Sequence, residues 1–255
     1  MTVFGLCSIK GAPGVTTLAL TLAGVWPRGR AVVVESDPDG GVIAARYQLG
    51  ANPGLLSLAV DARSTPTAGM FTDHTQDLGD DVRAVVAPLD TEAIRQALNA
   101  PYLHEALHQS DGDVLVDAGR ISPSTPALTL LRSADRVVFV LRPTLDVLRQ
   151  VPNRADLLDP AKVALVLIGE APYTATQVER VLTLPVVGVI ADDPRAAEAM
   201  SGGRQSPRTV RRSPLVRTAR RTAERLVTDA EARPGDVHSP KGAEATCPTP
   251  VEVRR

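Results

Sequence analysis

A glycine-containing loop near the start of the chain has the residue types and the position needed to bind phosphate. The loop follows the apolar run 3–9, and a helical pattern begins at Thr16, so strand, loop and helix are expected in succession. This order points backbone N–H groups and a helix N-terminus at phosphate oxygens, and glycines let the backbone come close. The loop reads Lys10-Gly11-Ala12-Pro13-Gly14-Val15-Thr16-Thr17.

Two carboxylates follow other apolar runs and could share the site with this loop. Asp37 comes directly after the run 31–35, and Asp117 ends the run 114–117. Because ligands bind outside the carboxyl ends of the strands in an open α/β sheet, both side chains are expected to face the same crevice. Each carboxylate alone is a weak signal, since Asp-Pro-Asp-Gly is also a common turn sequence. Their order and spacing relative to the loop make the set a strong signal.

The loop departs from the general P-loop pattern G-x-x-x-x-G-K-[ST], because Ile9 stands at the first glycine and Val15 at the lysine. It resembles instead the deviant loop K-G-G-x-G-K-T-T of the ParA/MinD family, which has an additional lysine at its start, matched here by Lys10. The resemblance covers roughly residues 3–228. It continues through Val34-Glu35-Ser36-Asp37-Pro38-Asp39-Gly40, Asp113-Val114-Leu115-Val116-Asp117-Ala118-Gly119, Ser133-Ala134-Asp135-Arg136-Val137-Val138-Phe139-Val140 and Leu184-Pro185-Val186-Val187-Gly188-Val189-Ile190.

Two further segments look most like the TadZ/CpaE branch of this family, which places pilus or secretion machines at the cell envelope. They are Gly54-Leu55-Leu56-Ser57-Leu58-Ala59 and Asp117-Ala118-Gly119-Arg120.

The resemblance implies ATP and Mg²⁺ as ligands and a nucleotide-dependent homodimer. Lys10 would reach across the dimer to the partner's phosphates, and Asp37 would lie near the attacking water, so both are predicted as catalytic. Thr16, Asp37 and Asp117 are the predicted metal ligands. The predicted nucleotide-binding residues are Lys10, Gly11, Ala12, Pro13, Gly14, Val15, Thr16 and Thr17.

The exchange of the P-loop lysine for Val15 predicts weak or absent hydrolysis. The lysine normally places a positive charge against the β and γ phosphates, where charge is reorganised during transfer. Loss of one such contact costs on the order of 3 kcal/mol of transition-state stabilisation, about a hundredfold in rate. Base recognition is not predicted either, because Gly169-Glu170 stands where the family usually has an asparagine.

Seven short apolar runs alternate with helix-length segments. Their apolar residues are continuous, as in strands buried on both faces of a parallel sheet. We therefore predict one α/β P-loop NTPase domain, residues 1–228, with a mostly parallel sheet of about seven strands and helices on both faces. The predicted strands are 3–9, 31–35, 82–87, 114–117, 136–141, 163–168 and 186–190, and the predicted helices are 16–25, 91–109, 126–132, 145–158, 175–182, 194–200 and 214–228.

Composition predicts a globular chain in a reducing compartment. Hydrophobic residues make up 44% of the 255 residues and charged residues 22%. There are two cysteines, and no apolar signal precedes the first run, so we expect a cytoplasmic protein, with peripheral contact at the inner face of the membrane as an open alternative. The segment 61–79 is polar and turn-rich, and residues 229–255 are predicted to form a disordered polar tail.

The net charge of −1 hides an asymmetry. Residues 1–200 carry 16 basic and 23 acidic side chains, whereas residues 201–255 carry 12 and 6. A basic face of this kind suits DNA phosphates or anionic lipid headgroups, and a solvated arginine face is the open alternative. The arginines predicted to make such contacts are Arg204, Arg208, Arg211, Arg212, Arg217, Arg220 and Arg221.

The segment His104-Glu105-Ala106-Leu107-His108 matches H-E-x-x-H, which on a helix can bind zinc with the glutamate as general base. No third ligand follows at the spacing of related zinc enzymes, and the helical pattern ends within a few residues. The sequence therefore favours a nucleotide-binding ParA/MinD-like positioning or assembly factor for envelope machinery, septum or chromosome. A nucleotide-free structural scaffold and a zinc hydrolase are the alternatives.

Overall fold

Strands buried on both faces form the centre of the structure. The computed structural model describes residues 1–11, 13–67, 69–200 and 210–232. Its eight-stranded sheet has the order β3-β4-β2-β5-β1-β6-β7-β8, and neighbouring strands are parallel except for β3 and β4. The strands are β1 (Val3–Ser8), β2 (Ala31–Glu35), β3 (Gln76–Asp77), β4 (Arg83–Val85), β5 (Asp113–Arg120), β6 (Arg136–Leu141), β7 (Val163–Ile168) and β8 (Val186–Ile190).

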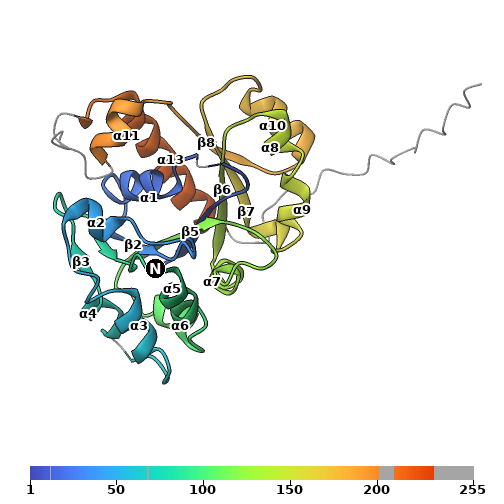
Figure 1. Ribbon diagram of the computed structural model, residues 1–255. Helices are drawn as coiled ribbons and strands as arrows, with labels where there is room; N and C mark the ends of the chain where they lie inside the picture. The colour runs from blue at the N-terminus through green and yellow to red at the C-terminus, as the bar shows by residue number, and fades with distance from the viewer. Residues whose placement is uncertain (12, 68, 201–209, 233–255) are drawn as a thin grey trace, which may run out of the picture.

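Helices cover both faces of the sheet, so the predicted α/β class is confirmed. One apolar cluster joins the sheet to α1, α2, α11 and α13, and a second joins its other face to α3 to α10. Figure 1 shows α1, α11 and α13 gathered on one side of the sheet. The helices are α1 (Val15–Ala23), α2 (Ile43–Tyr47), α3 (Leu55–Asp61), α4 (Met70–Asp73), α5 (Thr91–Leu98), α6 (Leu103–Leu107), α7 (Leu128–Ser133), α8 (Leu145–Leu148), α9 (Val151–Ala155), the 3-10 helix η1 (Pro160–Lys162), α10 (Ala175–Leu182), α11 (Pro194–Met200) and α13 (Pro214–Glu231).

Strand β1 shows why the apolar runs are continuous. All six of its residues are buried. Val3 and Cys7 belong to the cluster on one face, whereas Phe4 and Leu6 belong to the cluster on the other. Successive side chains of a strand point to opposite faces, and here both faces need apolar residues.

The structure divides two of the predicted helices and adds elements to segments that lacked a clear pattern. The helix predicted over 91–109 is α5 followed by α6, with Pro101 between them, because proline cannot continue the ladder of helical hydrogen bonds. The helix predicted over 145–158 is likewise α8 followed by α9, with Pro152 in the first turn of α9. The segment 61–79, predicted to be turn-rich, contains α4 and the antiparallel strand β3.

The last helix, predicted over 214–228, docks on the sheet through an apolar stripe. Leu215, Ala219, Ala223 and Leu226 are buried, and α13 packs mainly on β8. The helix reaches Glu231, so it continues into the segment predicted to be tail. Residues 233–255 of that tail, together with Arg204 and Arg208 of the predicted basic face, lie outside the described residues.

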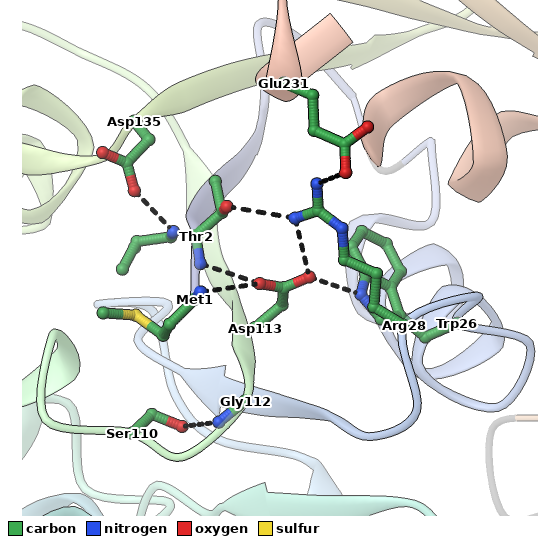
Figure 2. A network of polar contacts seen from close by, with 10 residues as sticks. Met1, Thr2, Trp26, Arg28, Ser110, Gly112, Asp113, Asp135 and Glu231 are labelled. Atoms are coloured by element: carbon green, nitrogen blue, oxygen red, sulfur yellow. Dashed lines mark hydrogen bonds and ion pairs between the residues drawn. The ribbon is translucent and has the colours of Figure 1, made fainter. Parts of the chain in front are cut away.

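A polar network fixes the first residue of β5 at the edge of the sheet opposite the strand ends that carry the predicted site (Figure 2). Asp113 accepts hydrogen bonds from the Thr2 amide at 2.7 Å and from the Trp26 indole at 2.8 Å. The Arg28 guanidinium lies 3.6 Å from the same carboxylate and also pairs with Glu231 of α13. One buried carboxylate thus links β5 to β1, to the segment after α1 and to the last helix.

In the part of the chain that the structure describes, no helix combines the length and the apolar character that crossing a membrane requires.

We predict that Asp113→Ala lowers the free energy of unfolding by about 2–4 kcal/mol, because the nearly buried Trp26 indole N–H loses its acceptor and the Arg28 guanidinium loses one of its two carboxylate partners. Urea denaturation followed by the fluorescence of the single tryptophan measures this change. Asp111→Ala, an exposed aspartate two positions away, is the matched control and should stay within about 0.5 kcal/mol of the wild type. Equal stability of the two variants would contradict the anchoring role.

Candidate phosphate- and metal-binding site

A pocket of about 310 Å³ opens at the carboxyl ends of β1, β2 and β5. Its walls include Gly14, Thr16, Asp37 and Asp117, so the structure brings together most of the residues that the sequence predicted. Strand β1 lies between β5 and β6, where the chain order of the sheet reverses, and this is the switch point at which α/β proteins bind ligands.

The loop after β1 turns into α1 at Gly14, which lines the pocket. Gly14 has φ 96° and ψ 44°, a left-handed conformation that favours glycine, and it is the N-cap of α1. Its carbonyl accepts the first helical hydrogen bond, from the Leu18 amide at 2.9 Å. The first turn of α1 therefore forms a wall of the pocket, where helix N–H groups and the helix dipole favour an anion.

Val15 contributes no charge to this wall. Its side chain is 7% exposed and belongs to the apolar cluster that contains Phe4 and Leu18. The position of the usual P-loop lysine is thus occupied by a residue of the hydrophobic core.

Asp117 is the most strongly perturbed carboxyl group of the pocket. It is fully buried; its Oδ1 accepts a hydrogen bond from the Gly119 amide at 3.2 Å, and its Oδ2 has no hydrogen-bond partner in the described part of the chain. The pKa of Asp117 is raised to about 7, mainly by burial and also by the charges of Asp37 and Glu35, while the Thr16 side chain and the Gly119 amide act in the opposite direction. An orphaned buried oxygen costs free energy unless a ligand or a proton satisfies it.

Gly119 lets Asp37 lie against the end of β5. The pairing of β1 with β5 shifts between Leu6 and Ser8, opposite the Asp117 to Arg120 segment. Gly119 has φ +60°, and a Cβ at this position would lie 2.2 Å from the Cγ of Asp37. Burial raises the pKa of the half-buried Asp37, and the nearby charge of Arg120 acts in the opposite direction. Any side chain at residue 119 would displace this carboxylate.

Glu35 supports the site without lining it. Its side chain is buried at the end of β2. Its Oε1 accepts the amides of Val42 at 2.5 Å and Ile43 at 2.9 Å, and its Oε2 accepts the amide of Ala87 at 2.9 Å. Burial raises the pKa of Glu35, while these three hydrogen bonds favour the carboxylate. Glu35 thus joins the end of β2 to the start of α2, which carries Arg46, and to the segment after β4.

Lys10 does not line the pocket in the single chain. Its side chain is 52% exposed, and its Nζ lies 2.8 Å from the Oδ2 of Asp146 in α8. The hydrogen bonds from Lys10 and Thr144 lower the pKa of Asp146 to about 2. The structure therefore separates Lys10 from Thr16, Asp37 and Asp117, with which the sequence had grouped it. Ala12 of the predicted loop lies outside the described residues.

Arg46 and Arg120 line the pocket although the sequence did not single them out as site residues. Arg46 lies in α2, and Arg120 is the last residue of β5. The only available signal was the position of Arg120 at the end of a strand that carries a predicted metal ligand. For Arg46 no local pattern exists, because only the tertiary placement of α2 brings it to the pocket.

The H-E-x-x-H segment lacks the surroundings of a zinc centre. Helix α6 has five residues, and His108 is its C-cap. The residues that the structure describes include no group of three or more His, Cys, Asp or Glu side chains that could hold a metal ion. A zinc site at this segment would therefore have no third ligand among these residues. Stoichiometric zinc in the purified protein would support the zinc hydrolase instead.

The donors present in the pocket fit a Mg²⁺–phosphate group. The unpartnered Oδ2 of buried Asp117, the Thr16 hydroxyl and the Asp37 carboxylate are oxygen ligands of the kind that Mg²⁺ prefers. The loop and the first turn of α1 would hold the phosphates, and the bound cation would neutralise part of their charge.

No family model matches the sequence, and no curated protein matches it. Solved structures do match. The MinD cell division ATPase of Pyrococcus furiosus is 20% identical with a TM-score of 0.71, over 89% of this chain and 98% of that one. The ParA family ATPase of Chlorobium tepidum is 18% identical with a TM-score of 0.69, over 88% and 98%. MinD of Pyrococcus horikoshii, solved with Mg-ADP, is 19% identical with a TM-score of 0.68, over 92% and 99%. The chain therefore has the fold of ParA/MinD P-loop NTPase domains.

We predict that Asp117→Asn stabilises the ligand-free protein at neutral and alkaline pH. The folded-state pKa of Asp117 is raised, so its contribution to stability is fully present below pH 4 and is lost as the pH rises through about 7. Asparagine cannot ionise, and the variant should gain on the order of 4 kcal/mol over the wild type as the pH rises from about 4 to 8. Denaturant unfolding in EDTA at several pH values measures the difference.

The exposed residue Asp111, changed to Asn, is the matched control, and its effect should not vary with pH. If the free energy of unfolding changes with pH in the same way for the wild type and for Asp117→Asn, the ionisation of the buried carboxyl does not destabilise the protein.

Proposed function

We propose that this chain binds Mg-ATP in the pocket after β1 and acts as a ParA/MinD-like positioning or assembly factor with weak or absent ATP hydrolysis. The observation that carries the proposal is the buried Oδ2 of Asp117, which has no hydrogen-bond partner among the described residues and lies in a pocket whose wall includes the loop leading to α1. The fold supports it, and the Pyrococcus horikoshii MinD structure is a Mg-ADP complex. A nucleotide-free scaffold gives no reason for a buried carboxylate oxygen that the described residues leave without a hydrogen-bond partner.

Slow turnover follows from the apolar residue at the lysine position. Val15 is apolar and packed in the core, so its side chain supplies no positive charge to the phosphates. The nearest lysine in the sequence, Lys10, is engaged by Asp146 in the single chain. Nucleotide would then act mainly by being bound and released, as in a switch or an assembly scaffold.

A homodimer is part of the proposal because Lys10 is free to change partners. Its ion pair with Asp146 is exposed on both sides, and exposed pairs of this kind contribute little to stability because water screens them. In a nucleotide-dependent dimer Lys10 would exchange this carboxylate for the phosphates bound by the partner. Light scattering or sedimentation with and without Mg-ATP measures the association, and an unchanged molar mass would contradict it.

The basic face on α13 is the proposed contact with DNA or with an anionic membrane. Arg217, Arg220 and Arg221 are exposed, and the described residues offer these three no ion-pair partner. DNA and an anionic membrane both match this charge, and the TadZ/CpaE-like segments favour a task at the envelope. Retention on DNA and co-sedimentation with anionic vesicles distinguish the two, and no binding to either would identify a solvated face.

We expect Mg-ATP to raise the melting temperature. A ligand at a hundred times its Kd stabilises the folded state by about 2.7 kcal/mol, which corresponds to several degrees for a chain of this size. ATP with EDTA should stabilise the protein less, and Thr16→Ala should remove most of the metal-dependent part of the shift. If millimolar Mg-ATP leaves the melting temperature unchanged, the nucleotide-free scaffold is the better description.

The Val15→Lys variant should hydrolyse Mg-ATP about ten to a hundred times faster than the wild type, because it restores the charge that stabilises phosphoryl transfer. Phosphate release at saturating Mg-ATP measures this gain. Val15→Met is the matched control, since it changes the packing in the same place without adding a charge. Wild-type turnover equal to that of ordinary ATPases of this fold, with no gain from Val15→Lys, would refute the proposed slow hydrolysis.

A further inference from the structure

We propose that Arg46 and Arg120 are the cations that bind the phosphates in this pocket, in the place of the absent P-loop lysine. This inference rests on the proposed nucleotide binding and adds to it the residues that recognise the triphosphate. The ligand class is a polyphosphate chain carried by a nucleotide.

Both arginines lie at the pocket and are available to a ligand. Each lines the same cavity as Gly14 and Thr16, and each is exposed to solvent. Within the described part of the chain neither forms an ion pair or a side-chain hydrogen bond. Other arginines are engaged differently: Arg142, for example, makes two hydrogen bonds to Asp192.

The position of Arg120 is fixed by the irregular end of β5. The Gly119 carbonyl accepts a hydrogen bond from the Ser8 hydroxyl at 3.3 Å, and the Ile121 amide donates to the Ser8 carbonyl at 2.9 Å. These contacts hold the backbone on both sides of Arg120 against the end of β1, from which the phosphate-binding loop starts. The charge of Arg120 also opposes the effect of burial on the pKa of Asp37, which places the guanidinium within electrostatic reach of the predicted metal ligands.

The position of Arg46 is fixed by the two ends of α2. Glu35 holds the first amides of the helix, as described above, and the Tyr47 hydroxyl donates to the Met200 carbonyl at 3.2 Å. The Arg46 amide itself is bound by the Val42 carbonyl at 3.0 Å. A short helix held in this way presents its arginine at the pocket before any ligand arrives, so less entropy is lost on binding.

The charge balance of the pocket requires cations of this kind. Its acidic lining residues are Asp37, Asp39 and Asp117, and a polyphosphate adds further negative charge. Val15 is apolar, and Lys10 is directed to Asp146 outside this pocket. Arg46 and Arg120 are the basic side chains that line it. A guanidinium can donate two parallel N–H groups to one phosphate, and so provides both charge and orientation.

The test is isothermal titration of the full chain with Mg-ATP and, separately, with Mg-tripolyphosphate. Arg46→Ala and Arg120→Ala should each weaken the binding of both probes about tenfold or more, because each removes a charged hydrogen-bonding group. Arg120→Lys, which keeps the charge, should retain more affinity than Arg120→Ala. Arg180→Ala, an exposed arginine of α10 that does not line this pocket, is the matched control and should bind like the wild type.

The outcomes separate this proposal from the one it rests on. If the wild type binds Mg-ATP but Arg46→Ala and Arg120→Ala bind as tightly as Arg180→Ala, the two arginines are solvated surface residues and only this inference falls. If the wild type binds neither probe, both proposals fall. Melting temperatures without ligand guard against misfolding, since neither arginine has an ion pair to lose and all variants should melt together.

Discussion

The unpaired oxygen of the buried Asp117 carboxyl is the constraint on which the rest of the site depends. A carboxyl in the centre of a sheet covered on both faces is costly in its charged form, and burial is the main reason that its pKa is raised to about 7. The surroundings nevertheless hold it in one place: β5 is anchored at its start by Asp113, and the Asp117 carbonyl accepts hydrogen bonds from the Ser36 amide and hydroxyl at the end of β2. A cation at this position would turn a destabilising group into a stabilising one.

The neighbours of Asp117 separate into residues that face the pocket and residues that shape it. Glu35 accepts three backbone amides, whereas Asp37 accepts a single one among the described residues, the Asp39 amide at 2.9 Å, and stays half open to the pocket. Gly119 makes the second arrangement possible, because its missing side chain leaves room for the Asp37 carboxylate. Glu35 is therefore held rigidly behind the pocket, and Asp37 is accessible from it. The apolar Val15 stands at the position where a P-loop lysine would supply a positive charge.

The features that depend on local pattern were predictable from the sequence. Continuous apolar runs gave the seven parallel strands, and carboxylates at the ends of β2 and β5 gave the metal-binding edge of the sheet. The features that depend on distant partners were not. The direction of the Lys10 side chain is set by Asp146, far along the chain, and Arg46 reaches the pocket only because Glu35 and Met200 hold α2. The two-residue strand β3 was not predictable either, because its pairing with β4 defines it and its own residues show no strand pattern.

The most direct measurement is a crystal structure of the chain grown with Mg²⁺ and a non-hydrolysable ATP analogue. The proposed function requires phosphate density along the loop after β1, with a metal ion bound by the Thr16 hydroxyl and contacting Asp117 directly or through one water molecule. Nucleotide bound elsewhere, or crystals from saturating ligand in which the pocket holds only water and the Asp117 Oδ2 remains without a ligand, would contradict it.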